Sequence, residues 1–322
     1  MQGLVQWRGF GIYRHFVQVN VAEQIKLAHW RLAVKPPSLI KIVLPVLVGM
    51  SMGYARVQEV DGLLLVFILL FAVLVQVTIV LLNDYADREA DALHGEFFPE
   101  LIDPRVIPLG LIGPGSLLRA GGGAALGVVA TGTLLYVLYD RTYAPCLALA
   151  SLLIFWMYSF PPVKLNYRGG GELLEMVGVG GVLPLAGYYF YTGEIHSYQV
   201  YLVLPLISYA LVSALASGLK HEPADRHTGK RTCAVLWGTT AVRWMILALQ
   251  VATAGACVFY FSQGWYGFPM LFFGAVVPLP LALIAFDKRA DYRDLAELGA
   301  YKKALTRSGY SVNLGFLLHF FG

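Results

Sequence analysis

Long apolar runs alternate with short polar segments along the whole chain. The clearest run, residues 63–82, reads LLLVFILLFAVLVQVTIVLL and has no charged side chain. A run of about twenty apolar residues is long enough to cross the hydrocarbon core of a membrane as an α-helix. The pattern therefore predicts an all-α, polytopic membrane protein with about nine transmembrane helices. The predicted spans are residues 39–57, 61–83, 117–139, 143–162, 172–192, 198–219, 244–262, 265–286 and 308–321.

The segment before the first span has a different pattern. Residues 20–34, NVAEQIKLAHWRLAV, alternate apolar and basic side chains at helical spacing. A helix of this kind lies in the membrane interface with its apolar face toward the lipid. Lys35-Pro36-Pro37 follows, and prolines interrupt a helix. Residues 1–38 are therefore predicted to form a cytoplasmic or interfacial segment.

The composition excludes an ordinary soluble protein. Of the 322 residues, 57% are hydrophobic and 14% are charged, and the mean hydropathy is +0.63. Soluble domains average about 25% charged residues. This composition leads us to expect membrane lipid around the protein. The net charge of +4 says little about partners, and we expect no nucleic acid. The three cysteines are too few and too scattered for a disulfide framework or a zinc site.

Basic residues orient the predicted spans. With a cytoplasmic N-terminus, Arg56 and Arg141 are the two Lys or Arg residues that fall on the outer side. Short loops rich in Lys and Arg stay in the cytoplasm, so this bias supports both the number of spans and their orientation. A bacterial or archaeal cell (inner) membrane is the simplest location. The long polar loops that then face the cytoplasm lie near residues 84–116, 163–171, 220–243 and 287–307.

An acidic stretch, NDYADREAD at residues 83–91, directly follows the second predicted span. On a helix its Asn83, Asp84, Asp87 and Asp91 fall within an arc of roughly 100°. Carboxylates on one face repel each other unless a cation lies between them. Mg²⁺ takes oxygen ligands and commonly joins carboxylates to substrate phosphates. The stretch therefore predicts a site for Mg²⁺ and a diphosphate, and the alternative is a solvated helix end that stops the span.

Two further polar segments belong to the same predicted face. One is SGLKHEPADRHTGKRT at 217–232, and the other is YSFPPVKLNYRGGGE at 158–172. Cations and loop amides in these segments can hold phosphate oxygens. Each cation alone fits ordinary cytoplasmic charge, but together with two acidic loops they favour a diphosphate clamp. The cations are Lys164, Arg168 and Lys230, and the other candidate site residues of these segments are Tyr158 and Asp225.

Several of these segments resemble one known family. NDYADREAD is similar to the NDxxDxxxD signature of the UbiA superfamily of intramembrane prenyltransferases, and DPRVIPLGLI resembles the segment that follows it. DRHTGKRTCAVLWG resembles the second acidic loop of the family. YSFPPVKLNYRGGGELLEMVGVGGVLPLAGYYFYTG and RLAVKPPSLIKIVLPVLVG are similar to the branch that prenylates 1,4-dihydroxy-2-naphthoate. The matching segments begin at residues 83, 103, 225, 158 and 31, so the resemblance implies one domain over residues 1–322.

The resemblance implies a fold, a reaction and a set of site residues. The fold would be a nine-helix bundle around a central cavity that faces the lipid. The reaction would join a polyprenyl diphosphate to an aromatic or other acceptor with Mg²⁺, in menaquinone biosynthesis for the naphthoate branch. The implied ligands of the metal are Asn83, Asp84, Asp87, Asp91 and Asp225. The implied contacts of the substrates are Lys164, Arg168, Lys230, Arg105 and Tyr158.

The chain departs from the family in its second acidic motif. Where the family has DxxxD, this chain has HEPAD, with His221 in the first position and Asp225 retained. Glu222 lies one residue along, but Pro223 disfavours helical geometry at that position. Three outcomes stay open: Glu222 supplies the missing carboxylate, His221 contacts the diphosphate or the metal, or one Mg²⁺ is weakened or lost.

Other functions stay open beside naphthoate prenylation. A different aromatic or lipid acceptor, or a terpene cyclase without an acceptor, would use the same acidic motifs. A non-catalytic isoprenoid-binding protein disarmed at His221 is an alternative of another class. A transporter fits less well, because its polar groups belong at mid-membrane, whereas these gather at one face. The sequence predicts neither the acceptor nor the length of the prenyl chain.

Overall fold

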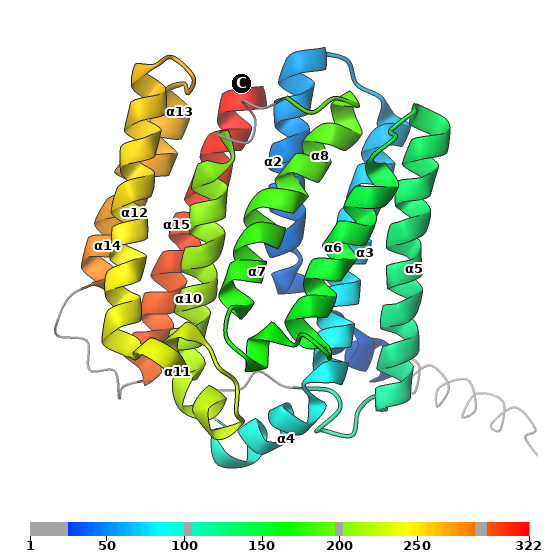
Figure 1. Cartoon of the computed structure of the whole chain (residues 1–322), viewed down its shortest axis with the longest axis vertical. Coiled ribbons are helices and arrows are strands. Elements are labelled where there is room, and N and C mark those ends of the chain that lie inside the picture. Colours follow the sequence, from blue (N-terminus) through cyan, green and yellow to red (C-terminus); the bar gives the residue numbers. More distant parts are fainter. Residues whose placement is uncertain (1–24, 100–104, 197–201, 287–294, 322) are drawn as a thin grey trace, which may run out of the picture.

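The structure is a computed structural model that describes residues 25–99, 105–196, 202–286 and 295–321. Within these ranges it contains helices and no strand, as the apolar pattern predicts. Most helices stand side by side in one bundle, while α4 (Arg88–Phe97) and α11 (Cys233–Trp237) lie across its lower end (Figure 1). The upright helices are α2 (Ile40–Val57), α3 (Gly62–Ala86), α5 (Pro114–Tyr139), α6 (Ala144–Ser159), α7 (Gly171–Val177), η3 (Gly178–Val182), α8 (Leu183–Thr192), α10 (Leu204–His227), α12 (Thr239–Ser262), α13 (Phe268–Leu271), η4 (Phe272–Val276), α14 (Pro278–Ala285) and α15 (Leu295–Phe321).

Apolar side chains cover much of the outside of the bundle. Leu126 and Val137 of α5 are 73% and 65% exposed, whereas Leu135 on the other face of the same helix is fully buried. An outer surface of this kind is unfavourable in water and suits a lipid environment. Among the residues that the structure describes, five helices are long and apolar enough to cross a membrane, and two shorter apolar helices accompany them. The protein is therefore an integral membrane protein.

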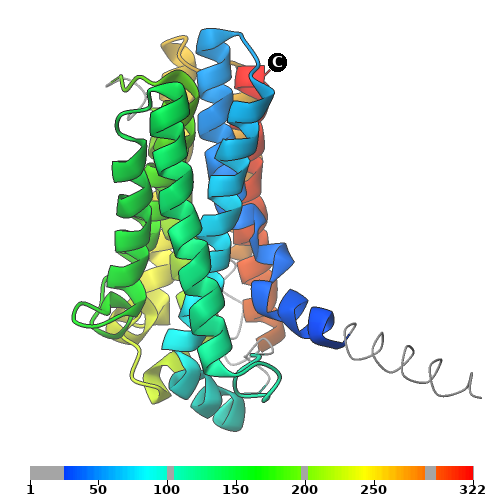
Figure 2. The ribbon, with the colours of Figure 1, turned by 90° about the vertical axis from the view of Figure 1, so that its right-hand side faces the viewer.

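The amphipathic helix before the first span is present over residues 25–34, the described part of the predicted 20–34. It leaves the lower part of the bundle sideways instead of running along it (Figure 2). The 3-10 turn η1 (Pro36–Ser38) connects it to α2. This direction suits a helix at the membrane surface, which is what its sequence predicts.

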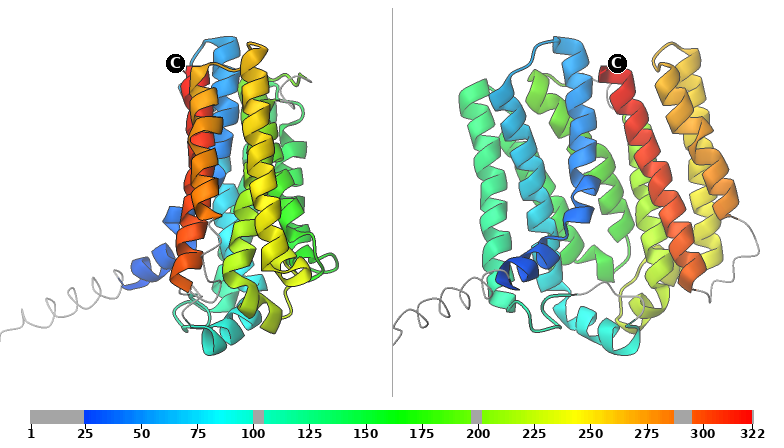
Figure 3. Two further views of the ribbon diagram at one scale, coloured as in Figure 1. Left: turned by 90° about the vertical axis from the view of Figure 1, so that its left-hand side faces the viewer. Right: turned by 180° about the vertical axis from the view of Figure 1, so that it is seen from behind.

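Two predicted spans are wrong in their bounds. The helix predicted over residues 198–219 continues to His227 as α10, although part of its predicted beginning lies outside the described residues. The last span, predicted as a short 308–321, begins at Leu295 as α15 and packs along α2, α10 and α14 (Figure 3). In both predictions, charged residues set one limit of the helix. Charged turns nevertheless stay helical where one face remains packed.

Two local predictions are also corrected. Pro223 does not end α10, because Ala224 and Asp225 beyond it are buried against the bundle. The acidic stretch is not one regular helix, because α3 ends at Ala86 and α4 begins at Arg88. Asp87 forms the junction between them. Its carbonyl still accepts a hydrogen bond from the amide of Asp91 at 2.7 Å, so the acidic residues stay close together.

Glycines allow α2 and α8 to approach closely. A Cβ atom at Gly49 would lie 1.8 Å from the carbonyl oxygen of Pro184. A Cβ atom at Gly187 would lie 2.2 Å from the carbonyl oxygen of Val46. Small residues at a helix interface bring two backbones together in this way in membrane proteins. The α2–α8 contact is therefore sealed along this part of the bundle.

Gly187→Val should destabilise the protein through this contact. Its side chain would overlap the backbone of α2, and overpacking costs about 1–3 kcal/mol. We expect the thermal midpoint in detergent to fall by about 2–6 °C, measured as loss of the folded-protein peak on size-exclusion chromatography. Gly255→Val on α12 is the matched control, because a Cβ atom there meets nothing within 4 Å. Equal midpoints for the two variants would contradict the sealed contact.

Candidate functional site

A polar cavity of about 260 Å³ lies at the end of the bundle where the charged loops gather. Its carboxylates come from the α3–α4 junction, from α4, from α7 and from α10. Burying carboxylates is costly unless they are paired or hold a cation. The carboxylates of this cavity therefore require positively charged partners. Its most deeply buried carboxylates are Asp87, Asp91, Asp225 and Glu172.

Asp87 is the centre of the hydrogen bonds in this cavity. One of its oxygens is 2.9 Å from Nζ of Lys230, and the other accepts a hydrogen bond from Oη of Tyr167 at 2.9 Å. Asn83 donates a longer hydrogen bond of 3.3 Å to the first oxygen. Lys230 follows α10 and Tyr167 follows α6. The three polar segments singled out in the sequence therefore meet at one carboxylate.

Asp84 is directed to a different part of the site. Its Oδ1 atom lies 2.6 Å from Nζ of Lys35 and 2.5 Å from Nη1 of Arg105. Arg105 also approaches Asp91, at 3.4 Å. The residues that line the polar cavity include Arg105 and Asp91, whereas Asp84 lies outside that lining. Asp84 thus connects the segment before α2 to the acidic stretch.

Burial and the neighbouring charges shift the pKa values of groups inside the cavity. Asp225 lies near the end of α10, beyond the predicted end of the span, and burial raises its pKa to about 7. Burial likewise raises the pKa of Asp91, against the influence of Arg105. Burial alone would lower the pKa of Lys230, but Asp87 and Asp225 raise it above its ordinary value. Lys230 is therefore held as a cation among the carboxylates.

The departure from DxxxD is visible in the cavity. His221 lines it and lies beside His94 of α4, with the ring centroids 5.6 Å apart. Glu222, by contrast, accepts hydrogen bonds from Nε and Nη2 of Arg226 at 2.8 and 2.6 Å. It stands outside the lining of the cavity. Of the possible replacements, the structure brings His221 and not Glu222 to the site.

Of three predicted substrate contacts, one lines the polar cavity and two lie outside it. Tyr158 lines the polar cavity. Lys164 lies outside that lining, with Nζ 3.8 Å from the ring centroid of Tyr167. Arg168 is exposed and lies outside it too. The cations that line the cavity in this conformation include Lys230 and Arg105 and neither of these two.

Some residues of the site were not among the predicted site residues. Lys35 and Tyr167 reach Asp84 and Asp87 from segments far away in the sequence. Glu172 accepts a hydrogen bond of 2.6 Å from the amide of Cys233, which fixes α7 to the segment after Lys230. Lys35 belongs to the interfacial segment, so its position alone pointed to lipid and not to the acidic stretch.

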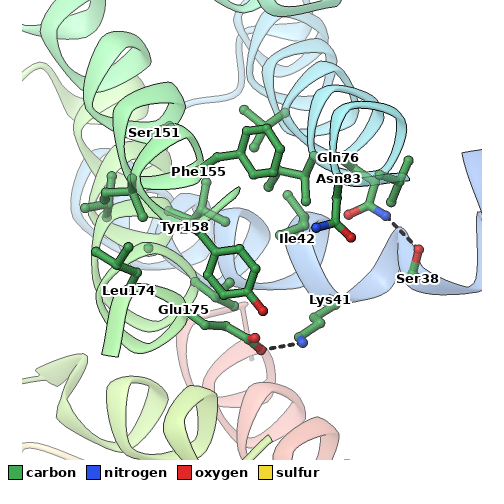
Figure 4. A pocket seen from close by; sticks show the side chains of 18 residues that line it. Ser38, Lys41, Ile42, Gln76, Asn83, Ser151, Phe155, Tyr158, Leu174 and Glu175 are labelled. Atoms are coloured by element: carbon green, nitrogen blue, oxygen red, sulfur yellow. Dashed lines mark hydrogen bonds and ion pairs between the residues drawn. The ribbon is translucent and has the colours of Figure 1, made fainter. Parts of the chain in front are cut away.

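A second, apolar cavity of about 230 Å³ adjoins the polar one. The two cavities share Lys41, Asn83, Tyr158 and Glu175, and Lys41 forms an ion pair with Glu175 at this border (Figure 4). Beyond the border the walls are mostly aliphatic or aromatic, with Phe155 among them, and Ser38, Gln76 and Ser151 are polar members of the lining. Together the cavities suit a molecule with a charged head and an apolar tail. The aliphatic lining consists of Ile42, Val75, Ile79, Val80, Ile154, Leu174, Val179, Val182 and Leu183.

The donors of the polar cavity fit a magnesium ion in their chemistry. Carboxylate oxygens of Asp87, Asp91 and Asp225 and the amide oxygen of Asn83 are the hard ligands that Mg²⁺ prefers. Within the described residues, however, no three His, Cys, Asp or Glu side chains are grouped closely enough to hold a metal. Lys230 contacts Asp87 in this arrangement. A metal would therefore replace that contact.

Several known proteins are similar to this chain. The 1,4-dihydroxy-2-naphthoate octaprenyltransferase of Haemophilus influenzae is 27% identical over 250 residues, which cover 74% of this chain and 78% of that enzyme. The enzyme of the same name from Bacillus subtilis is 23% identical over 221 residues, and this alignment spans 65% of each chain. The chain thus matches slightly less than two thirds of the Bacillus enzyme.

Solved structures agree with the fold. A structure of digeranylgeranylglyceryl phosphate synthase superposes with a TM-score of 0.66 at 15% identity, over 92% of this chain and 98% of that one. A UbiA homologue from Archaeoglobus fulgidus, bound to DMAPP and Mg²⁺, gives 0.63 at 14% identity over 88% and 98%. The model of the UbiA prenyltransferase family matches residues 42–300. Because this match covers most of the chain, the protein belongs to the UbiA prenyltransferase family.

Proposed function

We propose that the protein is a Mg²⁺-dependent prenyltransferase that transfers a polyprenyl group from its diphosphate to an aromatic acceptor. The proposed acceptor is 1,4-dihydroxy-2-naphthoate, as in menaquinone biosynthesis, because two relatives are enzymes named for that acceptor. The observation that carries the proposal is the joined pair of cavities, one with buried carboxylates and cations and one apolar. The proposed enzyme is one domain in a bacterial or archaeal cell (inner) membrane, with the polar cavity toward the cytoplasm.

The polar cavity would bind the diphosphate head. Asp87, Asp91 and Asp225, with Asn83, would hold Mg²⁺. The metal would supply positive charge to the leaving diphosphate. Cations of the protein add to that stabilisation at fixed positions, which is the most effective form of charge stabilisation in a transition state. Those within or beside the cavity are Lys230, Arg105 and Lys41.

The apolar cavity would hold the first part of the prenyl chain. As the allylic C–O bond breaks, the electron pair leaves with the diphosphate and the prenyl carbon becomes cationic. A dry site protects such a carbon from water. Tyr158, which lines both cavities, can offer its π face to the cation. An electron-rich ring then forms the new C–C bond, and a naphthoate acceptor loses its carboxylate as CO₂.

A transfer assay in isolated membranes tests the proposal. Labelled polyprenyl diphosphates are offered with Mg²⁺ against 1,4-dihydroxy-2-naphthoate, 4-hydroxybenzoate and homogentisate. We expect a prenylated naphthol that requires both the acceptor and the metal. A labelled hydrocarbon formed without any acceptor would indicate a cyclase. Absence of product with every acceptor would favour a binding protein and overturn the proposal.

His221 offers a test of whether the second acidic motif is disarmed. We expect the unaltered protein to be active and His221→Asp to change kcat/KM by no more than about tenfold, the equivalent of one modest charge interaction. Glu222→Gln should have little effect, because Glu222 pairs with Arg226 outside the cavity. Turnover that is near zero in the unaltered protein and restored by His221→Asp would support the disarmed alternative. Loss of activity in Glu222→Gln would show that Glu222 replaces the missing carboxylate.

A further inference from the structure

A third cavity, of about 240 Å³, lies between α2, α10 and α15, beside the two cavities of the candidate site. Resting on the proposed function, we propose that this third cavity binds the aromatic acceptor. The proposed ligand class is a hydroxylated aromatic acid, with its acid group at Lys302 and its remote hydroxyl group at Tyr209 and Asn313. The prenyl chain would then occupy the apolar cavity, and the acceptor a separate one.

Lys41 is a point at which all three cavities meet. It lines the polar cavity, the apolar cavity and the third cavity. The third cavity also shares Ser217 with the polar cavity, and Ser38 and Val179 with the apolar one. α15 packs against both α2 and α10 and forms one of its walls. A ligand in the third cavity can therefore reach the place where the head and the tail of the diphosphate substrate would join.

The border between the third cavity and the polar cavity carries a positive charge. Nζ of Lys302 on α15 donates a hydrogen bond of 3.3 Å to Oγ of Ser217, which lines both cavities. An ammonium group binds a carboxylate more strongly than a neutral donor does. In a naphthoate acceptor the attacked carbon carries the carboxylate. Holding that group at Lys302 therefore also keeps the reacting carbon near the junction of the cavities.

Further from this border, two polar side chains of the third cavity lack hydrogen-bond partners among the described residues. One is Tyr209 of α10, which is 4% exposed and whose Oη atom is buried. The other is Asn313 of α15, whose Oδ1 atom is buried while its amide nitrogen donates to the carbonyl of Gly309 at 2.8 Å. The Tyr209 ring also lies beside Gly309, since a Cβ atom there would be 4.0 Å from its Cδ1 atom. A donor and an acceptor are thus available near one turn of α15.

The apolar cavity differs in this respect. Beyond its border with the polar cavity, Gln76 donates to Oγ of Ser38 at 2.7 Å, and Ser151 donates to a backbone carbonyl of its own helix at 2.9 Å. A hydrocarbon tail in the apolar cavity leaves these groups satisfied. In the third cavity the same tail would keep Tyr209 and Asn313 buried without partners, which is costly. A hydroxyl group of an acceptor can accept from the former and donate to the latter.

The spacing of the polar groups fits one aromatic ring. Ser217 and Tyr209 are eight residues apart on α10, which is about 12 Å along the helix. A hydrogen bond of about 2.8 Å at each end leaves about 6 Å between the two polar groups of the ligand. One ring with an acid group at one edge and a hydroxyl group at the other spans such a distance. Leu44, Ala210 and Leu305 also line the cavity and offer apolar contacts to the ring.

Binding of three related probes tests the proposed contacts without turnover. The probes are 1,4-dihydroxy-2-naphthoate, 1-hydroxy-2-naphthoate, which lacks the remote hydroxyl group, and 1,4-naphthalenediol, which lacks the acid group. Their Kd values are measured by naphthalene fluorescence on the full-length protein in detergent, under nitrogen and without diphosphate. We expect Tyr209→Phe to weaken binding of the dihydroxy acid about three- to tenfold and to leave the monohydroxy acid unchanged. Lys302→Met should weaken both acids at least about tenfold and leave the diol unchanged.

The controls separate these contacts from general damage. Tyr266→Phe removes a buried hydroxyl group of the same apolar cluster that bonds to Leu202 and lies outside the cavity lining. Lys303→Met removes the exposed neighbouring charge on α15. Both controls should bind all three probes like the unaltered protein. Asn313→Ala is a second variant for the remote hydroxyl group, should Tyr209→Phe not fold. Losses that are equal for probes with and without the group concerned would overturn the inference.

Steady-state kinetics separate the acceptor from the prenyl chain. Tyr209→Phe and Lys302→Met should raise the KM for 1,4-dihydroxy-2-naphthoate and leave the KM for the polyprenyl diphosphate unchanged. A raised KM for the diphosphate alone would show that the third cavity holds the prenyl chain and would overturn the inference. Probe binding that follows the two groups, without transfer to any acceptor, would refute the proposed function and keep the acceptor site. Transfer with an unaltered acceptor KM in both variants would do the reverse.

Discussion

Asp87→Asn should nearly abolish prenyl transfer, lowering kcat/KM by about a thousandfold or more. Asp87 is 3% exposed and accepts contacts from Lys230, Tyr167 and Asn83. The substitution keeps the size of the side chain but removes its charge, so Lys230 loses its ion-pair partner in a buried place. It also replaces a charged carboxylate ligand of the proposed metal site with a neutral amide. Loss of one fixed electrostatic group in an active site costs about 10²–10³ in rate, and Asp87 serves two such roles.

The matched control for this variant is Glu89→Gln. Glu89 is two residues away on α4, and its side chain is 86% exposed and paired with Arg88. Its substitution removes the same charge from the same region without touching the cavity, so activity should stay within about twofold of the unaltered protein. Both variants should elute as folded protein at the position of the unaltered protein. Activity of Asp87→Asn within tenfold of the unaltered protein would contradict the central role of this carboxylate.

The fold class and the central residues of the site could be predicted from the sequence, for a physical reason. A membrane requires long apolar helices, so a polar cluster directly after such a run stands out. The meeting of residues 83–91 with Lys230 follows from the orientation of the spans, because loops of like orientation lie at one membrane face. The resemblance to a known family then supplied the reaction. None of this needed the detailed packing of the helices.

What the sequence could not supply depends on contacts between distant residues. α10 continues through Pro223 because Ala224 and Asp225 are buried against the bundle, and no local propensity shows that support. Arg226 pairs with Glu222 only because the helix continues. Lys164 and Lys230 are both cations in predicted loops, yet only Lys230 reaches a carboxylate of the cavity. Such choices are settled by tertiary geometry.

Lys230→Met should lower the maximal rate of transfer by about a hundredfold. The Lys230 side chain is 15% exposed and lies 2.9 Å from Asp87, and the pKa of Lys230 is raised by Asp87 and Asp225. In the proposed reaction this ammonium group would stabilise the charge of the leaving diphosphate, a contribution that methionine cannot make. Lys230→Arg keeps the charge with a different geometry and should recover part of the rate. Arg231→Met, at an exposed neighbouring position, is the control and should leave the rate unchanged.

A second measurement separates this role from a structural one. A metal ion bound as proposed would compete with Lys230 for the same oxygen of Asp87, because the ammonium group already contacts that oxygen. Removing the ammonium group should therefore reduce the Mg²⁺ concentration needed for half-maximal activity while the maximal rate falls. A merely structural lysine would lower the yield of folded protein and leave the Mg²⁺ dependence of the remaining activity unchanged. A Lys230→Met enzyme with a normal rate, or one that needs more Mg²⁺, would show that the Lys230–Asp87 pair is not the resting form of the metal site.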